Sequence, residues 1–410
     1  MRGSVRGLIA DLVEGVCQRS AGRAAAWTAG LTACAVAAAT PVFAEWLDVR
    51  WRTPLHATPD EFRPRQVAAP LVAKDGTLAW FATARGLVAL DPRDGQERWR
   101  QPSKEPMVGQ PVVADLPTEG TAAAWGPTLY AATLGGRLYA FNPTTGAPRW
   151  SDPVYLDAAV QSGLAADSRF VFASAAPAML LAMDRGTGKP AWRWSTLVDR
   201  DYVIEGQGAP TVHGGVLYAG TATGKLVALS ARDGALLWDA TLELKDRSPY
   251  GDVDSTPVVI AGARDAVVVA TSQSGGLCAL ATDDGHLLWR YPGEGFGQPT
   301  VVPGGILVAS ALGELHLVDW KGRRRAARKL AEPIAGAITP IGEGLGLVPS
   351  ERGLDVVRLS ELRPLLRLSS ETGFQAPAVV AGTMVLAVSN HGVALGLRVQ
   401  PGGGLHADWR

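Results

Sequence analysis

Short segments of alternating apolar and polar residues, each followed by a turn and a second short apolar stretch, recur along the chain. The clearest example spans residues 224–238 and reads GKLVALSARDGALLW. Residues 225–229 alternate as a strand does, Ser230 to Gly234 have the composition of a turn, and Ala235 to Trp238 begin a return strand. The segment therefore predicts a β-hairpin that ends on a large aromatic residue.

The same hairpin is written four more times, and each copy has a tryptophan at the equivalent place. The copies are 86–99 (GLVALDPRDGQERW), 136–150 (GRLYAFNPTTGAPRW), 180–192 (LLAMDRGTGKPAW) and 276–289 (GLCALATDDGHLLW). A unit that recurs at intervals of about 40–45 residues indicates a repeat architecture.

Two further short strands precede each hairpin. The second of them is represented by residues 216–219 and 266–270. The first is led by a proline, which is tolerated where a strand begins because that residue need not donate to the ladder. The clear cases are Pro70, Pro111, Pro210, Pro257, Pro299 and Pro377. Four short strands per unit are typical of a β-propeller blade.

The number of hairpins gives the number of blades. They start at Gly86, Gly136, Ala178, Gly224, Gly276, Gly313, Gly353 and Gly392. The last three units have lost the tryptophan at the usual position, and the sixth has Trp320 inside its turn. We therefore predict an all-β fold, an eight-bladed β-propeller of four-stranded antiparallel blades, with seven blades as the alternative.

The ring is predicted to close through its N-terminal strand. Residues 49–54 (VRWRTP) resemble the last strand of a repeat, as in residues 97–102 (ERWRQP), yet no first three strands precede them. A fourth strand without its own blade predicts that the segment around Trp51 completes the last blade. Residues 405–410 (LHADWR) are a rival closing strand.

The repeated tryptophans are interpreted as structural residues. A single four-stranded blade exposes two apolar faces and is marginal alone. Each indole can bury about 150–250 Å² against the neighbouring blade while its N–H reaches a backbone carbonyl. They are expected to be core residues rather than a cofactor site. The set comprises Trp51, Trp99, Trp150, Trp192, Trp238 and Trp289.

Composition and charge exclude some classes of protein. The chain has 410 residues with 39 basic and 39 acidic side chains. Its net charge of zero lacks the basic excess that is typical of nucleic-acid-binding proteins. Its cysteines are Cys17, Cys34 and Cys278, and only Cys278 lies in the repeats, which excludes a disulfide framework.

The first 44 residues have the pattern of an export signal. Residues 24–44 carry no charge and follow Arg19 and Arg23. Cleavage after Ala44 is the favoured interpretation. Lipidation of Cys34, in the lipobox-like stretch 31–34, and retention as an uncleaved membrane anchor are the alternatives. All three place residues 45–410, the single propeller domain, outside the cytoplasm.

The repeat pattern Ala-x-Asp-x-x-Thr-Gly-x-x-x-Trp, complete at residues 182–192, resembles that of pyrroloquinoline-quinone-type propellers. Within that superfamily residues 45–410 resemble the propeller lipoproteins of the outer-membrane β-barrel assembly machinery, the BamB family. The resemblance implies a non-enzymatic periplasmic scaffold at the outer membrane. It also implies binding to the barrel-inserting subunit, with nascent β-barrel proteins as further partners, and a monomer within a complex.

The resemblance rests most specifically on two loops. Residues 251–259 (GDVDSTPVV) enter blade 5, and residues 202–206 (YVIEG) enter blade 4. In the family these neighbouring loops contact the periplasmic domains of the barrel-inserting subunit. The resemblance carries an acidic pair over onto Asp252 and Asp254 and an aliphatic contact onto Ile204. Glu205 stands where the family has a basic residue, and turn capping is the alternative role for the two aspartates.

An enzyme is the principal competing function, because the repeat family includes quinone-dependent dehydrogenases. The resemblance implies that such enzymes need a clamped quinone, calcium and a catalytic aspartate, and many stack the quinone on adjacent disulfide-bonded cysteines. This chain has no adjacent cysteine pair, and Cys278 takes the place of a core aliphatic residue. The histidines are scattered without metal-ligand spacing: His56, His213, His286, His316, His391 and His406. We therefore expect no enzyme activity and no cofactor.

One charge run remains. It contains Lys321, Arg323, Arg324, Arg325, Arg328 and Lys329 and falls on the predicted outermost strand of blade 6. The usual interpretation is a solvated strand edge guarded by charge. Contact with anionic lipid or with an acidic partner is the alternative. A generic envelope propeller that binds another protein or a glycan is the competing scaffold function.

Overall fold

The computed structural model describes residues 47–56, 68–114, 126–176, 178–197, 208–244, 251–261, 266–334 and 336–399. The predictions for the export segment 1–44 and its boundary, for Cys34, for Ile204 and for the rival closing strand 405–410 lie outside these residues. Among the described residues, no helix has the length and apolar character needed to cross a membrane.

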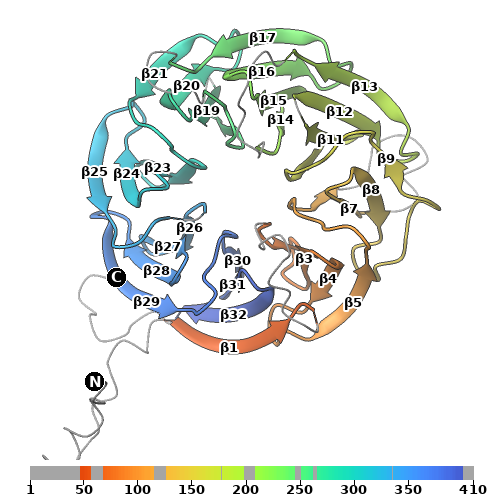
Figure 1. The fold of residues 1–410 in the computed structure, drawn as a ribbon, viewed down its shortest axis with the longest axis horizontal. Helices are drawn as coiled ribbons and strands as arrows, with labels where there is room; N and C mark the ends of the chain where they lie inside the picture. Colours follow the sequence, from red (N-terminus) through yellow and green to blue (C-terminus); the bar gives the residue numbers. More distant parts are fainter. Residues whose placement is uncertain are drawn as a thin grey trace, which may run out of the picture. The chain divides into compact units, whose positions relative to one another are not determined.

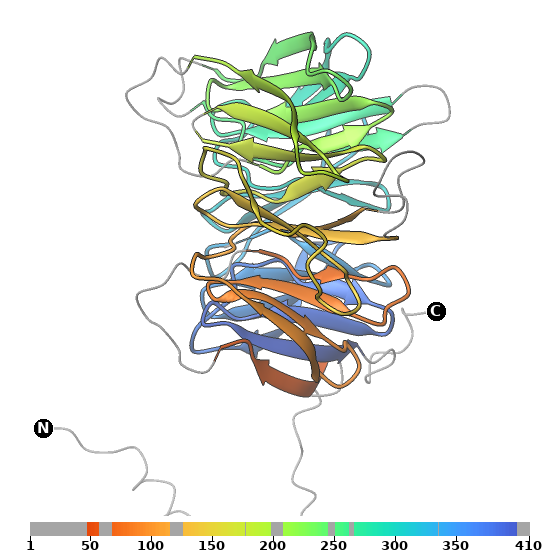
Figure 2. The same ribbon diagram turned by 90° about the vertical axis from the view of Figure 1, so that its right-hand side faces the viewer.

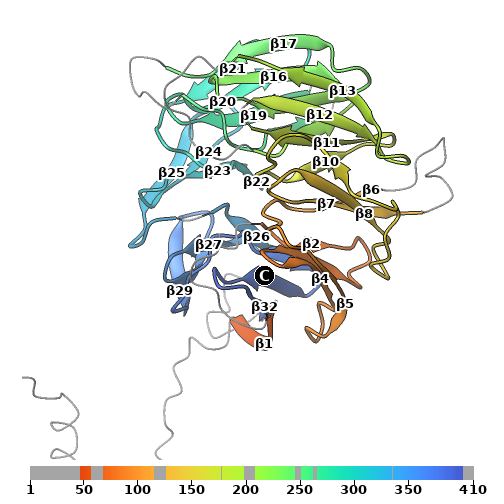
Figure 3. The ribbon, with the colours of Figure 1, turned by 45° about the vertical axis from the view of Figure 1, so that its right-hand side comes forward.

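The described residues form 32 strands in eight sheets of four, and the sheets stand as blades in a ring around a central axis (Figure 1). Neighbouring strands within a blade are antiparallel, and in the first seven blades they follow chain order. The first strand of each blade lies nearest the axis, as β2, β22 and β26 do in Figure 3. The predicted all-β, eight-bladed propeller is confirmed.

The first four blades are each continuous in sequence. Blade 1 contains β2 (Leu71–Val72), β3 (Ala79–Thr83), β4 (Gly86–Leu90) and β5 (Glu97–Pro102). Blade 2 contains β6 (Val112–Ala114), β7 (Thr128–Ala132), β8 (Arg137–Phe141) and β9 (Val154–Tyr155). Blade 3 contains β10 (Leu164–Ala166), β11 (Phe170–Ala175), β12 (Met179–Asp184) and β13 (Pro190–Ser195). Blade 4 contains β14 (Thr211–His213), β15 (Val216–Gly220), β16 (Lys225–Ser230) and β17 (Leu236–Thr241).

Of the last four blades, the eighth combines strands from both ends of the repeat region. Blade 5 contains β18 (Val258–Ala261), β19 (Ala266–Ser272), β20 (Gly276–Ala281) and β21 (Leu287–Tyr291). Blade 6 contains β22 (Thr300–Val302), β23 (Gly305–Ala309), β24 (Glu314–Val318) and β25 (Arg324–Lys329). Blade 7 contains β26 (Thr339–Gly342), β27 (Leu345–Ser350), β28 (Gly353–Arg358) and β29 (Arg363–Ser369). Blade 8 contains β30 (Val379–Ala381), β31 (Met384–Val388), β32 (Val393–Val399) and β1 (Leu47–Pro54).

Closure by the N-terminal strand is confirmed. β1 pairs antiparallel with β32, from Leu47 opposite Val399 to Pro54 opposite Val393. A bulge between Val49 and Trp51 shifts the register by one residue. β1 therefore becomes the outermost strand of blade 8, beside β32 in Figure 1.

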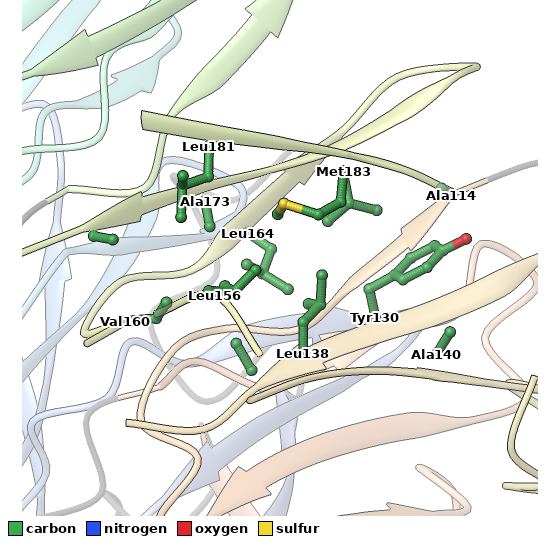
Figure 4. Packing of buried hydrophobic residues seen from close by; sticks show 13 residues of the cluster. Ala114, Tyr130, Leu138, Ala140, Leu156, Val160, Leu164, Ala173, Leu181 and Met183 are labelled. Atoms are coloured by element: carbon green, nitrogen blue, oxygen red, sulfur yellow. The ribbon is translucent and has the colours of Figure 1, made fainter. Parts of the chain in front are cut away.

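The hydrophobic core lies between blades. The two middle strands of a blade are buried along their length, as in β3 and β4, because a neighbouring blade covers each face. The fourth strands are largely exposed. Figure 4 shows the cluster between blades 2 and 3, in which Tyr130 and Leu138 come from blade 2 and Leu181 and Met183 from blade 3. Blade-to-blade contact thus supplies the burial that one blade lacks.

The tryptophans join each blade to the next through its last turn. Five indole N–H groups donate to a backbone carbonyl there at 3.0 Å: Trp51 to Pro92, Trp99 to Pro143, Trp192 to Ala231, Trp238 to Thr282 and Trp289 to Trp320. Each of these rings also lies over a glycine of that turn, so close that a Cβ on the glycine would come within 3.0 Å of it. The glycines are Gly95, Gly146, Gly234, Gly285 and Gly322, all with positive φ.

Trp150 corrects the prediction that every repeat indole reaches a carbonyl. Its buried Nε1 makes no hydrogen bond. The equivalent carbonyl in blade 3, that of Arg185, accepts a hydrogen bond from the Tyr130 hydroxyl at 3.0 Å instead. The strand around Trp150 is also broken, since Pro153 has no N–H to donate and only Val154–Tyr155 pair as β9.

Candidate protein-docking site at the entrances of blades 4 and 5

Residues 251–257 lead into the inner strand of blade 5 and carry the predicted acidic pair. Consecutive turns of an antiparallel sheet alternate between its two ends. The entrance loops therefore share one face of the ring with the turns between second and third strands, and the last turns of the blades occupy the other face. Figure 2 shows the blades edge-on, with their connections gathered on these two faces.

The middle of this loop is fixed to blade 4. Val253 is 1% exposed and packs in the core cluster between blades 4 and 5. Its N–H donates to the carbonyl of Thr221, in the turn after β15, at 3.1 Å. Gly220 allows this approach, since a Cβ there would overlap the Val253 carbonyl. The acidic residues on either side of Val253 are consequently held in fixed positions.

The two aspartates have different surroundings. Asp252 is 2% exposed, and its carbonyl accepts a hydrogen bond from the Gln273 N–H at 3.0 Å. Asp254 is half-buried, and its Oδ2 accepts a hydrogen bond from Gln273 Nε2 at 2.8 Å. Burial raises the pKa of Asp254, with a further increase from the nearby Asp252, while the hydrogen bond from Gln273 opposes the shift. Asp254 is therefore the carboxyl group of the pair that solvent reaches.

The entrance of blade 4 lies directly beside that of blade 5. The N–H of Ala209 donates to Thr256 Oγ1 at 3.0 Å, and Thr211 Oγ1 donates to the carbonyl of Pro257 at 2.6 Å. Gly208 approaches the backbone of Ser255 so closely that a Cβ would overlap it. The described ends of the two loops are thus neighbours. Ile204, earlier in the blade 4 loop, is outside the described residues, and its contact role stays a prediction.

Two glutamines position the loop, and sequence reasoning missed them. Gln273 holds Asp254 as described above. Gln298 makes a bidentate contact with the backbone of Thr256, accepting from its N–H at 2.8 Å and donating to its carbonyl at 2.9 Å. A signal existed, because Gly-Gln-Pro occurs at residues 109–111 and again at 297–299. Gln110 makes the related contact with the carbonyl of Pro70 at 3.1 Å.

Turn capping is carried out by other aspartates, on the opposite face of the ring. Asp94, Asp233 and Asp284 each accept a hydrogen bond from the backbone N–H two residues later, at 2.9 to 3.2 Å. Asp254 instead accepts from a side chain of the neighbouring turn. Its hydrogen bond joins two loops rather than closing one.

The groups with potential for metal or redox chemistry also have structural roles. Cys278 is fully buried, and burial raises the pKa of its thiol to about 11, as expected of a core residue. In the described residues, Asp283, Asp284 and His286 bring their ligand atoms within 4.8 Å of one another in an exposed turn of blade 5. Asp284 there accepts from the His286 N–H, and the two side chains meet at 2.6 Å.

The similarity to known proteins extends over the repeats. The family model described as "Outer membrane protein assembly factor BamB" matches residues 48–116 and 116–329. An outer membrane protein assembly factor BamB from Xanthomonas campestris pv. campestris is 33% identical over 335 residues, which cover 77% of this chain and 78% of that protein.

Solved structures show the same fold at low sequence identity. BamB from Moraxella catarrhalis aligns with a TM-score of 0.67 and 18% identity over 85% of this chain and all of that chain. The quinohemoprotein alcohol dehydrogenase ADHIIG from Pseudomonas putida HK5 also aligns with a TM-score of 0.67, at 15% identity, over 86% of this chain and 76% of that chain. Both likenesses concern the fold alone.

Proposed function

The chain belongs to the BamB family of outer membrane protein assembly factors, and on this premise we propose that it is a non-enzymatic periplasmic scaffold associated with the outer membrane. Its proposed partner is the barrel-inserting subunit of the assembly machinery, through that subunit's periplasmic domains. Nascent β-barrel proteins are further candidate partners, and the protein is proposed to act as a monomer within the complex.

The observation that carries this proposal is the adjacency of the blade 4 and blade 5 entrances. The described parts of both, residues 208–211 and 251–257, are tied to each other and to the ring by hydrogen bonds, so docking orders little of these parts. Asp254 offers a carboxylate at this surface, where Arg or Lys of a partner can pair with it. Truncating one member of a desolvated charge pair costs about 2–5 kcal/mol of binding free energy.

The test is capture of the barrel-inserting subunit from detergent-solubilised envelopes. Asp254→Asn removes the charge but keeps an oxygen that can accept from Gln273. We expect it to reduce capture at least tenfold, and the double change Asp252→Ala with Asp254→Ala to abolish capture. Asp284→Asn, an exposed carboxyl on the opposite face, is the matched control and should bind as wild type does.

Fold integrity is measured separately, because Asp252 is buried. Thermal melting of every variant is followed by circular dichroism. A variant that loses capture and also has a lowered Tm has lost its fold rather than its docking contact. Undiminished capture by the folded double variant would exclude these loops as the docking site. Failure of the wild-type protein to capture the subunit would favour a generic envelope propeller that binds another protein or a glycan.

A quinone-dependent dehydrogenase is the competing function, since such enzymes share the propeller fold. The residues present fit that activity poorly. Residues 45–410 contain a single cysteine, Cys278, so the adjacent cysteine pair that the resemblance implies for many such enzymes cannot form. That cysteine is also packed in the core between blades 4 and 5.

A further inference from the structure

Exposed apolar side chains gather on the face of the ring opposite the entrance loops. The fourth strands of blades 4 and 5 both begin with two leucines, which are 45–53% exposed: Leu236, Leu237, Leu287 and Leu288. The two positions before the repeat tryptophan, which these leucines occupy, hold Glu97 and Arg98 in blade 1 and Pro148 and Arg149 in blade 2. In blade 6 the last turn presents Trp320, which is 46% exposed. The repeat pattern does not require this apolar surface, since other blades do without it.

A hollow of about 510 Å³ lies between blades 5 and 6 at this place. Its walls include Ile260, Val267 and Leu288 from blade 5 and Trp320 and Lys321 from blade 6. We call it the blade 5–6 groove. Its volume falls in the range of about 300–1,000 Å³ that protein pockets for ligands occupy.

The groove is preformed. The indole of Trp289 forms part of its wall and donates to the carbonyl of Trp320 at 3.0 Å. The same ring lies against Gly322, which leaves no room for a Cβ. The two blades are therefore locked together at the groove, and an incoming side chain meets a fixed apolar surface.

A basic strand begins beside the groove, since Lys321, in the turn before β25, forms part of the wall. β25 and the turn before it carry the run Lys321, Arg323, Arg324, Arg325, Arg328 and Lys329, all exposed. Asp319 pairs with Arg323 at 3.1 Å, and Arg325 donates to the carbonyl of Gly304 at 3.3 Å. β25 is the outermost strand of blade 6, so its second backbone edge is not paired within the sheet. Positive charge, an open strand edge and an apolar hollow thus occur side by side.

We propose that the blade 5–6 groove and β25 form a second docking surface, which binds an acidic, extended protein segment carrying one bulky apolar side chain. The apolar side chain fills the hollow, and the carboxylates of the segment face the basic strand. Charge complementarity selects an acidic partner. A concave hollow favours a protein segment over a flat membrane surface, which apolar groups enter by protruding.

This inference goes beyond the proposed function, because the groove and the entrance loops lie on opposite faces of the ring. Each surface can be disabled without touching the other. If both are used, the propeller connects two protein partners across its thickness. A partner on the groove leaves Asp254 accessible.

The test uses the full-length protein and a short fluorescein-labelled peptide with a central phenylalanine flanked by glutamate and aspartate. Binding is followed by fluorescence anisotropy. We expect saturable binding that weakens between about 50 and about 500 mM salt, because ions screen exposed charges. Trp320→Ala, Leu288→Ala and the pair Lys321→Glu with Arg325→Glu should each weaken binding about tenfold. Glycine in place of the peptide's phenylalanine should do the same.

Matched controls occupy the equivalent positions one or two blades away. Leu237→Ala removes an exposed leucine of blade 4, and Arg232→Glu reverses a turn charge of blade 4; neither should change the affinity. Equal peptide binding by the groove variants and wild type would overturn the proposal. Absence of peptide binding with retention on phosphatidylglycerol vesicles would overturn it as well, in favour of a membrane-facing surface.

Discussion

Gly234→Ala tests whether the tryptophan of one blade is locked on the turn of the next. Gly234 has a φ of 73° and lies under the Trp192 ring, where a Cβ would be 2.7 Å from Cε3. The methyl group must displace the indole, and with it the hydrogen bond from Trp192 Nε1 to the carbonyl of Ala231. Gly214→Ala is the matched control, since Gly214 also has positive φ, 59°, but no atom within 4 Å of a Cβ.

The two variants separate backbone strain from lost packing. A left-handed conformation costs an alanine about 1 kcal/mol at either site. At Gly234, exposing about half of a tryptophan's buried area of 150–250 Å² costs roughly 2–3 kcal/mol more, at about 25 cal/mol per Å². The lost hydrogen bond adds about 1 kcal/mol. We therefore expect Gly234→Ala to lower the free energy of unfolding by about 4–5 kcal/mol and Gly214→Ala by about 1 kcal/mol.

Thermal unfolding followed by circular dichroism measures the difference. In a protein of this size, 1 kcal/mol shifts Tm by roughly 1–2 °C. Gly234→Ala should therefore lower Tm several times more than Gly214→Ala. Hydrogen exchange at the amides between β16 and β17 should accelerate only in Gly234→Ala. An equal decrease of Tm in the two variants would refute the reasoning, because it would leave only the strain that both share.

Three further outcomes are expected. Cys278 should react with a thiol reagent only after unfolding, because it is buried and its pKa is raised to about 11; rapid reaction of the native protein would contradict this. Hydrogen bonds from Arg93, and also from Arg98, hold the pKa of buried Asp91 well below its usual range. Its stabilisation is thus present above the unfolded value of 3.8 and is lost as the pH falls, so the Tm difference between wild type and Asp91→Asn should shrink below about pH 4. Pyrroloquinoline quinone with calcium should leave Tm unchanged, whereas a saturable rise would revive the dehydrogenase interpretation.

The fold could be predicted from the sequence because its determinants are local and repeated. Each hairpin carries its own alternation, turn residues and tryptophan. Even the closing strand was identifiable, since residues 49–54 repeat the pattern of another fourth strand. Trp150 escaped prediction because Pro153 interrupts the strand, and because the Tyr130 hydroxyl donates to the carbonyl of Arg185, which is equivalent to the acceptors of the other indoles.

The candidate site was less predictable because its geometry depends on contacts between blades. Sequence placed Asp252 and Asp254 together in one loop. Their different exposure arises from Val253, which packs against blade 4, and from Gln273, which reaches Asp254 from another turn. Neither contact has a periodic signature. The blade 5–6 groove was equally hidden, since it combines residues from two blades.

Closure by β1 also affects the order in which the ring can fold. Among the described strands, residues 47–54 are synthesised first, yet their partner strand, residues 393–399, follows the seven other blades in the chain. Contacts of such large sequence separation form slowly. During that interval β1 must wait without a partner, as a strand that other chains can pair with. Arg50, Arg52 and Pro54 are exposed on it in the finished ring, and they are the residue types that discourage such pairing. The composition of β1 thus disfavours pairing with other chains during the time before β32 has formed.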